Sequence, residues 1–287
     1  MPKAAALLIP ATLFAIMFAL ALGLPEDTLT WVRRRRLLLL RVLLGSCFLV
    51  PLVALGLLKL PFAAAISPPG RFAIGLMAVC PSAPLTLRKA GKAGGSSPLA
   101  ATLQVSAALA AIVSIPVMAY VLTRAHGLEG WEILPRQVAR QIAVAQILPL
   151  TIGMLVRRWQ PAWAQRQQQT FDRLANGLLA LLIGVVLFKT GPMLVPFLGR
   201  NLLALAAMAA VVVASMTIGF LLAGGAEEQR TTAALVTSMR NPGLALLFAG
   251  IYSPTMDGLK LAILTYLLVT VLVQIPFVRW RRGLAGR

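Results

Sequence analysis

Apolar stretches of about 18 or more residues recur along the whole sequence, and they restrict the fold more than any other feature. As a helix, each stretch can cross the roughly 30 Å hydrocarbon core of a bilayer. Because 59% of the residues are hydrophobic and only 12% are charged, a soluble domain of this length could not bury its apolar surface. No alternating pattern of about ten residues indicates a barrel. The sequence therefore predicts an all-α polytopic membrane protein that lies in a lipid bilayer.

The order of apolar and charged segments predicts nine transmembrane helices, at roughly residues 4–24, 37–58, 72–88, 97–123, 138–156, 174–191, 201–224, 231–252 and 259–278. Lysine and arginine residues are most frequent in the loops that this count places on the inner side. That bias predicts an outside N-terminus and an inside C-terminus, in the inner or plasma membrane of the cell. The first span shows no small-residue cleavage site, so we expect it to be retained.

The longest predicted connection, residues 124–137, carries Trp131 and mixed charges and is expected to lie along the outer interface. It divides the chain into a first half, 1–123, with four spans and a second half, 138–287, with five. Halves of this kind are typical of inverted-repeat transporters.

The composition also bears on other classes of function. The net charge of +19 could suggest nucleic acid as a partner, but basic residues in a membrane protein usually mark topology and contacts with anionic lipid. Cys47 and Cys80 both lie in apolar segments, which indicates neither a disulfide scaffold nor a metal site. No hydrolase motif or paired carboxylates occur at membrane depth, so no enzyme and no cofactor are predicted.

Two predicted spans are interrupted in their middle. Residues 72–88 contain Pro81 and Pro84, and residues 231–252 contain Asn241-Pro242-Gly243. Proline removes a backbone donor and glycine permits unwinding, so both spans are expected to be discontinuous helices. Broken helices at corresponding positions of two halves indicate a binding site near the bilayer midplane. The alternative is that each is merely a kinked span.

Four motifs resemble elements of the bile acid:sodium symporter family. "SMRNPGLAL" and "AVCPSAPLT" are similar to the centres of that family's two crossing broken helices, and "MFALALGL" and "ILPLTIGMLVRRW" resemble an early element and the opening of its second half. The likeness extends over most of residues 10–280. It implies an inverted repeat with two crossing discontinuous helices, a panel and a core subdomain, and alternating access.

Sodium ligands of that family are mostly replaced here. The resemblance places its acidic ligand on Val236, a glutamine on Arg240 and a second glutamine on Ser46, and it places the other ligands at Thr86, Leu87, Ala100 and Gln104. A buried sodium ion usually needs a carboxylate, and all eight acidic residues lie in predicted loops or at span ends. A sodium site of the usual kind is therefore not expected.

Arg240 instead supplies a permanent positive charge in the second break. At this depth the guanidinium needs a partner, and its planar fork suits a carboxylate, sulfate or phosphate. The predicted function is secondary transport of a small organic or inorganic anion. The predicted substrate-binding residues are Arg240, Asn241, Ser238, Thr237, Ser82, Thr86 and Gln104, and the helix-break residues are Pro81, Pro84, Pro242 and Gly243.

Several alternatives stay open at this point. Arg240 could have a purely structural role. The protein could be a sodium-coupled symporter with a rebuilt ion site, or a non-transporting receptor or assembly subunit on the same fold. The sequence does not determine the oligomeric state, and a homo-oligomer is one of the options.

Overall fold

A computed structural model describes the chain except for residues 1–2, 25–34, 82–85, 127–134, 254 and 286–287. The described residues form helices and turns, with no strand among them. The helices of the first part are α1 (Lys3–Leu22), α3 (Arg36–Leu44), the π-helix η1 (Gly45–Leu49), α4 (Val50–Leu58), the 3-10 helix η2 (Pro61–Ala65), α5 (Pro68–Val79), α6 (Thr86–Lys92) and α7 (Ser97–His126). Those of the second part are α8 (Pro135–Ile142), the π-helix η3 (Ala143–Ile147), α9 (Leu148–Trp159), α10 (Pro161–Arg200), α11 (Leu202–Ala223), α12 (Glu227–Ser238), α13 (Pro242–Tyr252) and α14 (Leu259–Ala285).

The all-helical membrane fold predicted from the apolar stretches is confirmed. Five helical segments of the described chain are long and apolar enough to cross a membrane, namely Arg36–Leu58, Ser97–Arg124, Leu202–Ala223, Glu227–Ile251 and Leu259–Leu284. Helices α1, α5, α6, α8, α9 and α10 cover the other predicted spans but are not among these five segments, so the total of nine crossings stays a prediction. The inverted repeat and the division into halves also stay predictions. The predicted interfacial connection falls largely on residues 127–134, which lie outside the described part of the chain.

The structure differs from the prediction most clearly in α10. The sequence predicts a span at 174–191 flanked by loops, but α10 runs from Pro161 to Arg200 as one helix of 40 residues. Its first turns are rich in glutamine, which is polar but forms helices readily, and Pro161 begins the helix at a position where proline is well tolerated. Only Gln160 separates it from α9. The prediction that residues 157–173 form a loop is therefore wrong, while their place on the inner side stays a prediction.

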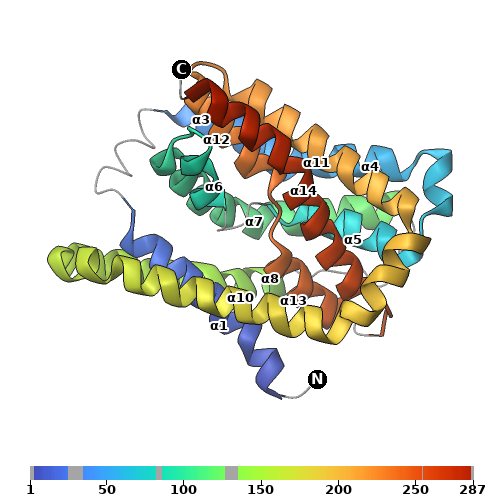
Figure 1. Ribbon diagram of the computed structural model, residues 1–287, viewed down its shortest axis with the longest axis horizontal. Helices are drawn as coiled ribbons and strands as arrows, with labels where there is room; N and C mark the ends of the chain where they lie inside the picture. The colour runs from blue at the N-terminus through green and yellow to red at the C-terminus, as the bar shows by residue number, and fades with distance from the viewer. Residues whose placement is uncertain (1–2, 25–34, 82–85, 127–134, 254, 286–287) are drawn as a thin grey trace.

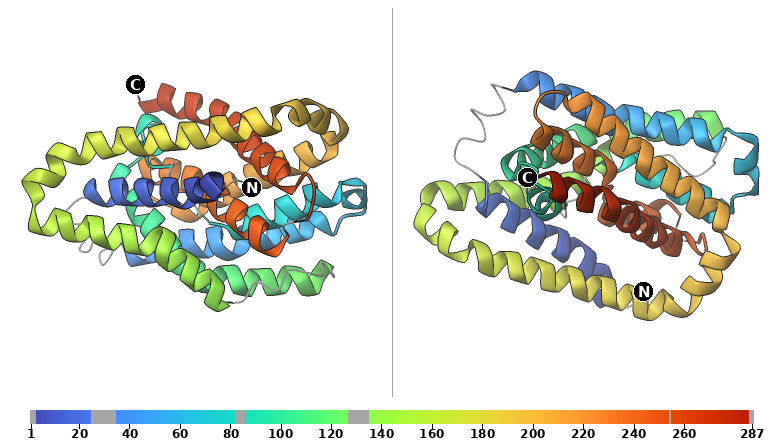
Figure 2. Two further views of the ribbon diagram at one scale, coloured as in Figure 1. Left: turned by 90° about the horizontal axis from the view of Figure 1, so that it is seen from below. Right: turned by 45° about the horizontal axis from the view of Figure 1, so that its top comes forward.

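The helices form two groups that lie side by side (Figure 1). Helices α1, α8, α9 and α10 make up the smaller group, and Figure 2 shows α1 lying between the two arms of the hairpin formed by α9 and α10. The larger group contains α3 to α7 and α11 to α14. A small apolar cluster joins the two groups, because Met17 and Leu20 of α1 and Leu150 of α9 pack with Ala101 of α7.

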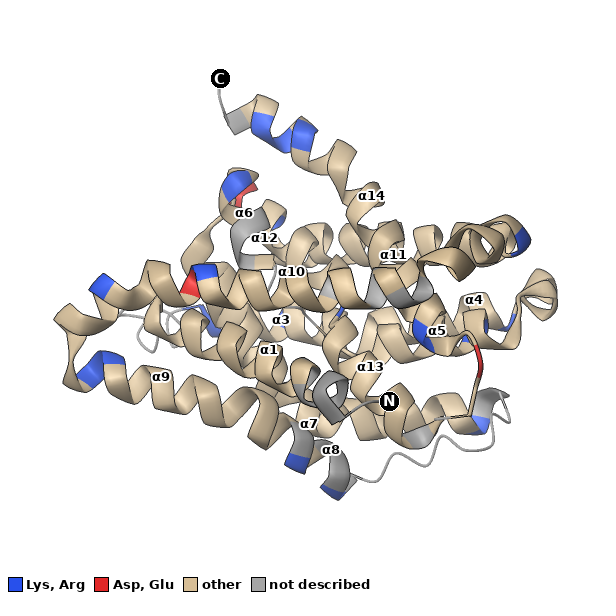
Figure 3. Ribbon diagram, turned by 60° about the horizontal axis from the view of Figure 1, so that its bottom comes forward, with Lys and Arg blue, Asp and Glu red and all other residues tan. Residues whose placement is uncertain are grey.

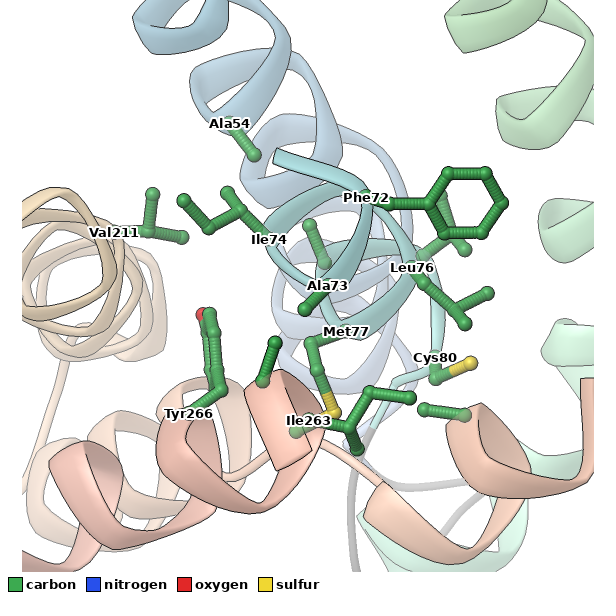
Figure 4. Close-up of a cluster of buried hydrophobic side chains, with 14 of the residues drawn as sticks. Ala54, Phe72, Ala73, Ile74, Leu76, Met77, Cys80, Val211, Ile263 and Tyr266 are labelled. Atoms are coloured by element: carbon green, nitrogen blue, oxygen red, sulfur yellow. The ribbon is translucent and has the colours of Figure 1, made fainter. Parts of the chain in front are cut away.

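A hydrophobic core fills the larger group around α5. Figure 4 shows side chains of α5, such as Ile74 and Met77, packed between Val211 of α11 and both Ile263 and Tyr266 of α14. In α5 the residues from Phe72 to Val79 are all buried, although the helix is only 12 residues long. A helix that is buried on all sides has no lipid-facing stripe. The first broken helix thus begins at the surface with Pro68 and is enclosed by the protein from Phe72 onward.

Helices α11 and α12 approach each other closely at Gly219. A side-chain carbon at this position would come within 2.7 Å of Thr237 Oγ1 and would also collide with the backbone carbonyl of Ala233. The absence of a side chain therefore permits the contact that holds α12 against α11.

We predict that Gly219→Ala lowers the stability of the protein by about 1–3 kcal/mol, because the backbone of α12 must move to make room. Gly184→Ala is the matched control, since a carbon added to Gly184 on α10 meets nothing within 4 Å. That variant should be neutral or slightly stabilised, because alanine favours the helix. Melting curves of the detergent-purified proteins measure both effects, and equal shifts would contradict the proposed close approach.

Candidate functional site

The second broken helix unwinds between Ser238, where α12 ends, and Pro242, where α13 begins. Met239 and Asn241 have extended backbones, and extension at Asn241 follows from the proline after it, which disfavours helical dihedrals in the preceding residue. Pro242 then starts α13 at the position that best accepts proline. The Asn241 side chain caps the helix, because its Oδ1 accepts a hydrogen bond of 3.1 Å from the backbone N–H of Leu244.

The first broken helix has the same local design. Helix α5 ends at Val79, and Cys80 is extended in front of Pro81. Helix α6 begins at Thr86. Pro84 and Ser82, which the sequence analysis includes among the break and binding residues, lie outside the described residues.

The two breaks meet. The backbone N–H of Asn241 donates to the carbonyl oxygen of Cys80 over 3.1 Å. Both residues precede a proline. Without this bond, the Asn241 N–H and the Cys80 carbonyl would have no helical hydrogen-bond partner. The bond therefore joins the two unwound links directly at the centre of the larger group.

Arg240 lies in the second link and is completely buried, with 0% of its surface exposed. Its Nη1 donates to the carbonyl oxygen of Ser46 over 2.9 Å and approaches the Ser46 hydroxyl at 3.4 Å. Ser46 belongs to η1 in the neighbouring helix. No ion pair within the described residues involves Arg240. The guanidinium is thus hydrogen-bonded to a backbone carbonyl and a hydroxyl, and no carboxylate of the described chain pairs with it.

Several buried donors around the link form no hydrogen bond with the described residues. They are Nε and Nη2 of Arg240, Nδ2 of Asn241, Oγ1 of Thr237 and the hydroxyl of Tyr266. The orientation of the Asn241 amide is determined, because only its oxygen can accept the bond that caps α13. Nε and Nη2 lie on one edge of the planar guanidinium and present their hydrogens in parallel, so that one edge of Arg240 is unpaired.

Helix α14 supplies polar residues that the sequence analysis missed. Gln274 Nε2 donates to the hydroxyl of Ser238 over 2.9 Å, directly before the link, and the buried Tyr266 hydroxyl forms no hydrogen bond with the described residues. Toward the end of the same helix, Arg281 forms an ion pair of 2.6 Å with Glu227 and donates to Thr231 over 2.7 Å. A signal was present in the sequence, since Tyr266 and Gln274 are eight residues apart and therefore lie on one face of α14.

The remaining predicted residues are buried at different places. Thr237 is buried and lies against Gly219 of α11. Thr86 and Gln104 are buried on α6 and α7, the two helices that pack beside α12. Gly243 faces the smaller group, because a side-chain carbon there would come within 2.8 Å of Leu13 on α1. The crossing thus contacts both groups of helices.

The sodium bile acid symporter family matches residues 10–197, about two-thirds of the chain. The chain belongs to this family. The resemblance predicted from the sequence is therefore confirmed, and the protein is a multi-pass membrane protein of a transporter family.

The matched residues contain the first broken helix but end before the second one. A search of curated proteins finds no match. The family match therefore does not extend to α12, α13 and Arg240.

We predict that Asn241→Ala lowers the free energy of unfolding by about 0.5–2 kcal/mol, because α13 loses its N-terminal cap. Asn241→Ser should recover most of this loss, since serine also provides a capping oxygen. Thermal unfolding of the three proteins measures the difference. If serine destabilises as strongly as alanine, the cap is not the reason for an asparagine at this position.

Proposed function

We propose that this protein is a secondary transporter of a small anion, that it works without sodium sites of the usual kind, and that Arg240 provides the positive charge at the crossing. The observation that carries the proposal is the complete burial of Arg240 without a carboxylate partner among the described residues. An arginine at the centre of a membrane costs at least about 2.5–3.5 kcal/mol. An anionic substrate would offset part of this cost.

The partners of Arg240 support a role in place of a bound cation. In the resemblance to the symporter family, Arg240 and Ser46 both stand where glutamine ligands of sodium are expected. The structure brings these two residues into hydrogen-bond contact. A tethered guanidinium at that point would supply positive charge permanently, so that no sodium ion has to bind first.

The unpaired edge of Arg240 indicates the chemistry of the anion. Two parallel N–H donors match two oxygens on one atom, as in a carboxylate, sulfate or phosphate. We propose that Asn241 contributes a further donor through Nδ2 and that Ser82, Thr86, Thr237, Ser238 and Gln104 complete the surroundings of the site. Because Arg240 is enclosed, its edge becomes available only when the unwound links move.

The arrangement in two groups of helices is compatible with such a movement. We propose that the smaller group acts as the panel and the larger group as the core, and that rocking between them exposes the crossing to each side in turn. The small apolar cluster between α1, α7 and α9 and the contact of Leu13 with Gly243 would change during this motion.

The first experiment measures the melting temperature of the purified protein with sodium, lithium or potassium and with a panel of carboxylates, sulfonates, sulfate and phosphate. A ligand at a hundred times its dissociation constant stabilises the folded state by about 2.7 kcal/mol, or roughly 5–10 °C here. We expect an anion to raise the melting temperature of the wild type but not of Arg240→Met, and sodium to have no specific effect.

Arg281→Met is the matched control, because Arg281 is also buried in the larger group but is paired with Glu227. It should keep the response to the anion. A sodium-specific shift that persists in Arg240→Met would contradict the proposal and favour a rebuilt ion site. Uptake of the identified anion into vesicles then tests transport, and binding without flux would favour a receptor.

The proposed topology has the N-terminus outside and the C-terminus inside. Figure 3 shows lysine and arginine mainly at helix ends and turns, as expected where helices leave the bilayer. The side of the turn between α9 and α10, with Arg157, Arg158 and Arg166, would be the inner one.

We predict that a reporter protein that is active only in the cytoplasm will be active when it is fused to the C-terminus. A cysteine introduced at Arg158 should be protected from a membrane-impermeant thiol reagent in intact cells, whereas one at Lys59 should react. The reverse labelling pattern would invert the topology.

A further inference from the structure

The carbonyl that binds Arg240 is one that its own helix cannot use. In a π-helix each carbonyl accepts from the N–H five residues later, and in η1 the N–H of Val50 donates to the Gly45 oxygen in this way. The next carbonyl, that of Ser46, would accept from residue 51. That residue is Pro51, which has no N–H.

Arg240 supplies the missing donor. Its Nη1 reaches the Ser46 oxygen at 2.9 Å, although 194 positions separate the two residues in sequence. A buried carbonyl without a partner and a buried guanidinium without a partner are both unfavourable in a membrane. The one hydrogen bond satisfies the carbonyl and one of the three guanidinium nitrogens, and it leaves Nε and Nη2 unpaired.

We infer that Pro51 is a positioning residue for Arg240. By withholding an N–H, Pro51 leaves the Ser46 carbonyl to the guanidinium, which ties down Nη1 and keeps the edge formed by Nε and Nη2 unpaired. The hydrogen bond alone supports this positioning, and its consequence for anion binding rests on the proposed function.

A second π-helix provides an internal comparison. In η3 the N–H of Leu148 donates to the Ala143 oxygen, and Pro149 follows, so that the Val144 carbonyl lacks a helical donor in the same way. Arg240 forms no hydrogen bond with η3 within the described structure. Pro149 thus shares the local backbone chemistry of Pro51 but not its link to the arginine.

The test is a double-mutant cycle on the full-length protein without added ligand. Pro51→Ala restores an N–H that can pair with the Ser46 carbonyl, and Arg240→Met removes the guanidinium while keeping an apolar side chain. The melting temperatures of the wild type, the two single variants and the double variant are compared. The same cycle with Pro149→Ala is the control.

We compare the change in melting temperature caused by Pro51→Ala in two backgrounds. With Arg240 present, this change should be about 2–4 °C less favourable than it is in Arg240→Met. In the Met background the restored N–H completes the helix, whereas in the wild type it competes with the guanidinium. Pro149→Ala should have the same effect in both backgrounds. An equal effect of Pro51→Ala in both backgrounds would overturn the inference.

Fluorescent fusions in solubilised membranes allow low-yield variants to be measured, and Pro51→Val, which also restores the N–H, replaces alanine if that variant does not fold. A second readout is the melting shift caused by the anion that stabilises the wild type. It should be smaller in Pro51→Ala but unchanged in Pro149→Ala, and equal shifts would contradict a role in binding. If no anion stabilises the wild type, the proposed function fails, while the cycle still decides the role of Pro51.

Discussion

Backbone polar groups that lose their helical partners in a membrane must find others within the protein, and the centre of this structure depends on how they do so. Each such group left alone costs several kcal/mol. Prolines at positions 81 and 242 force extended backbone at Cys80 and Asn241, and these two residues then bond to each other across the crossing. Either break alone would be expensive. Together they form a stable junction in which helix ends are directed toward one place.

The same requirement explains the environment of the buried charge. Arg240 and Arg281 are both enclosed by the larger group of helices, but their partners differ in kind. Arg281 is near the end of α14 and pairs with the carboxylate of Glu227, so that its charge is balanced locally. Among the described residues, Arg240 bonds only to the carbonyl and hydroxyl of Ser46. A charge that is held in position but not neutralised is suited to attract an anion, which is why the proposed function centres on this residue.

Both groups of helices contribute to the crossing. The larger group encloses α5 and the two unwound links, while α1 of the smaller group contacts Gly243 at the start of α13. The long helix α10 and its hairpin with α9 hold α1 in place (Figure 2). A movement of the smaller group would therefore act directly on the link that contains Arg240, and this connects the architecture with the transport that we propose.

The sequence by itself determined that the protein lies in a lipid bilayer, that it is helical and which family it resembles. The length of an apolar stretch and a local motif depend only on residues close together in the chain. The sequence also indicated where the helices break, since Pro81, Pro242 and Gly243 act through their own backbone chemistry. It did not predict the full extent of α10, whose polar first turns resemble a loop in composition although glutamine readily forms helices. Only the tertiary structure decided which groups meet. The pairs Cys80 and Asn241, Ser46 and Arg240, and Ser238 and Gln274 are far apart in sequence, and Thr237 lies against Gly219 of α11. Those pairings follow from the packing of whole helices, which no local pattern of residues encodes.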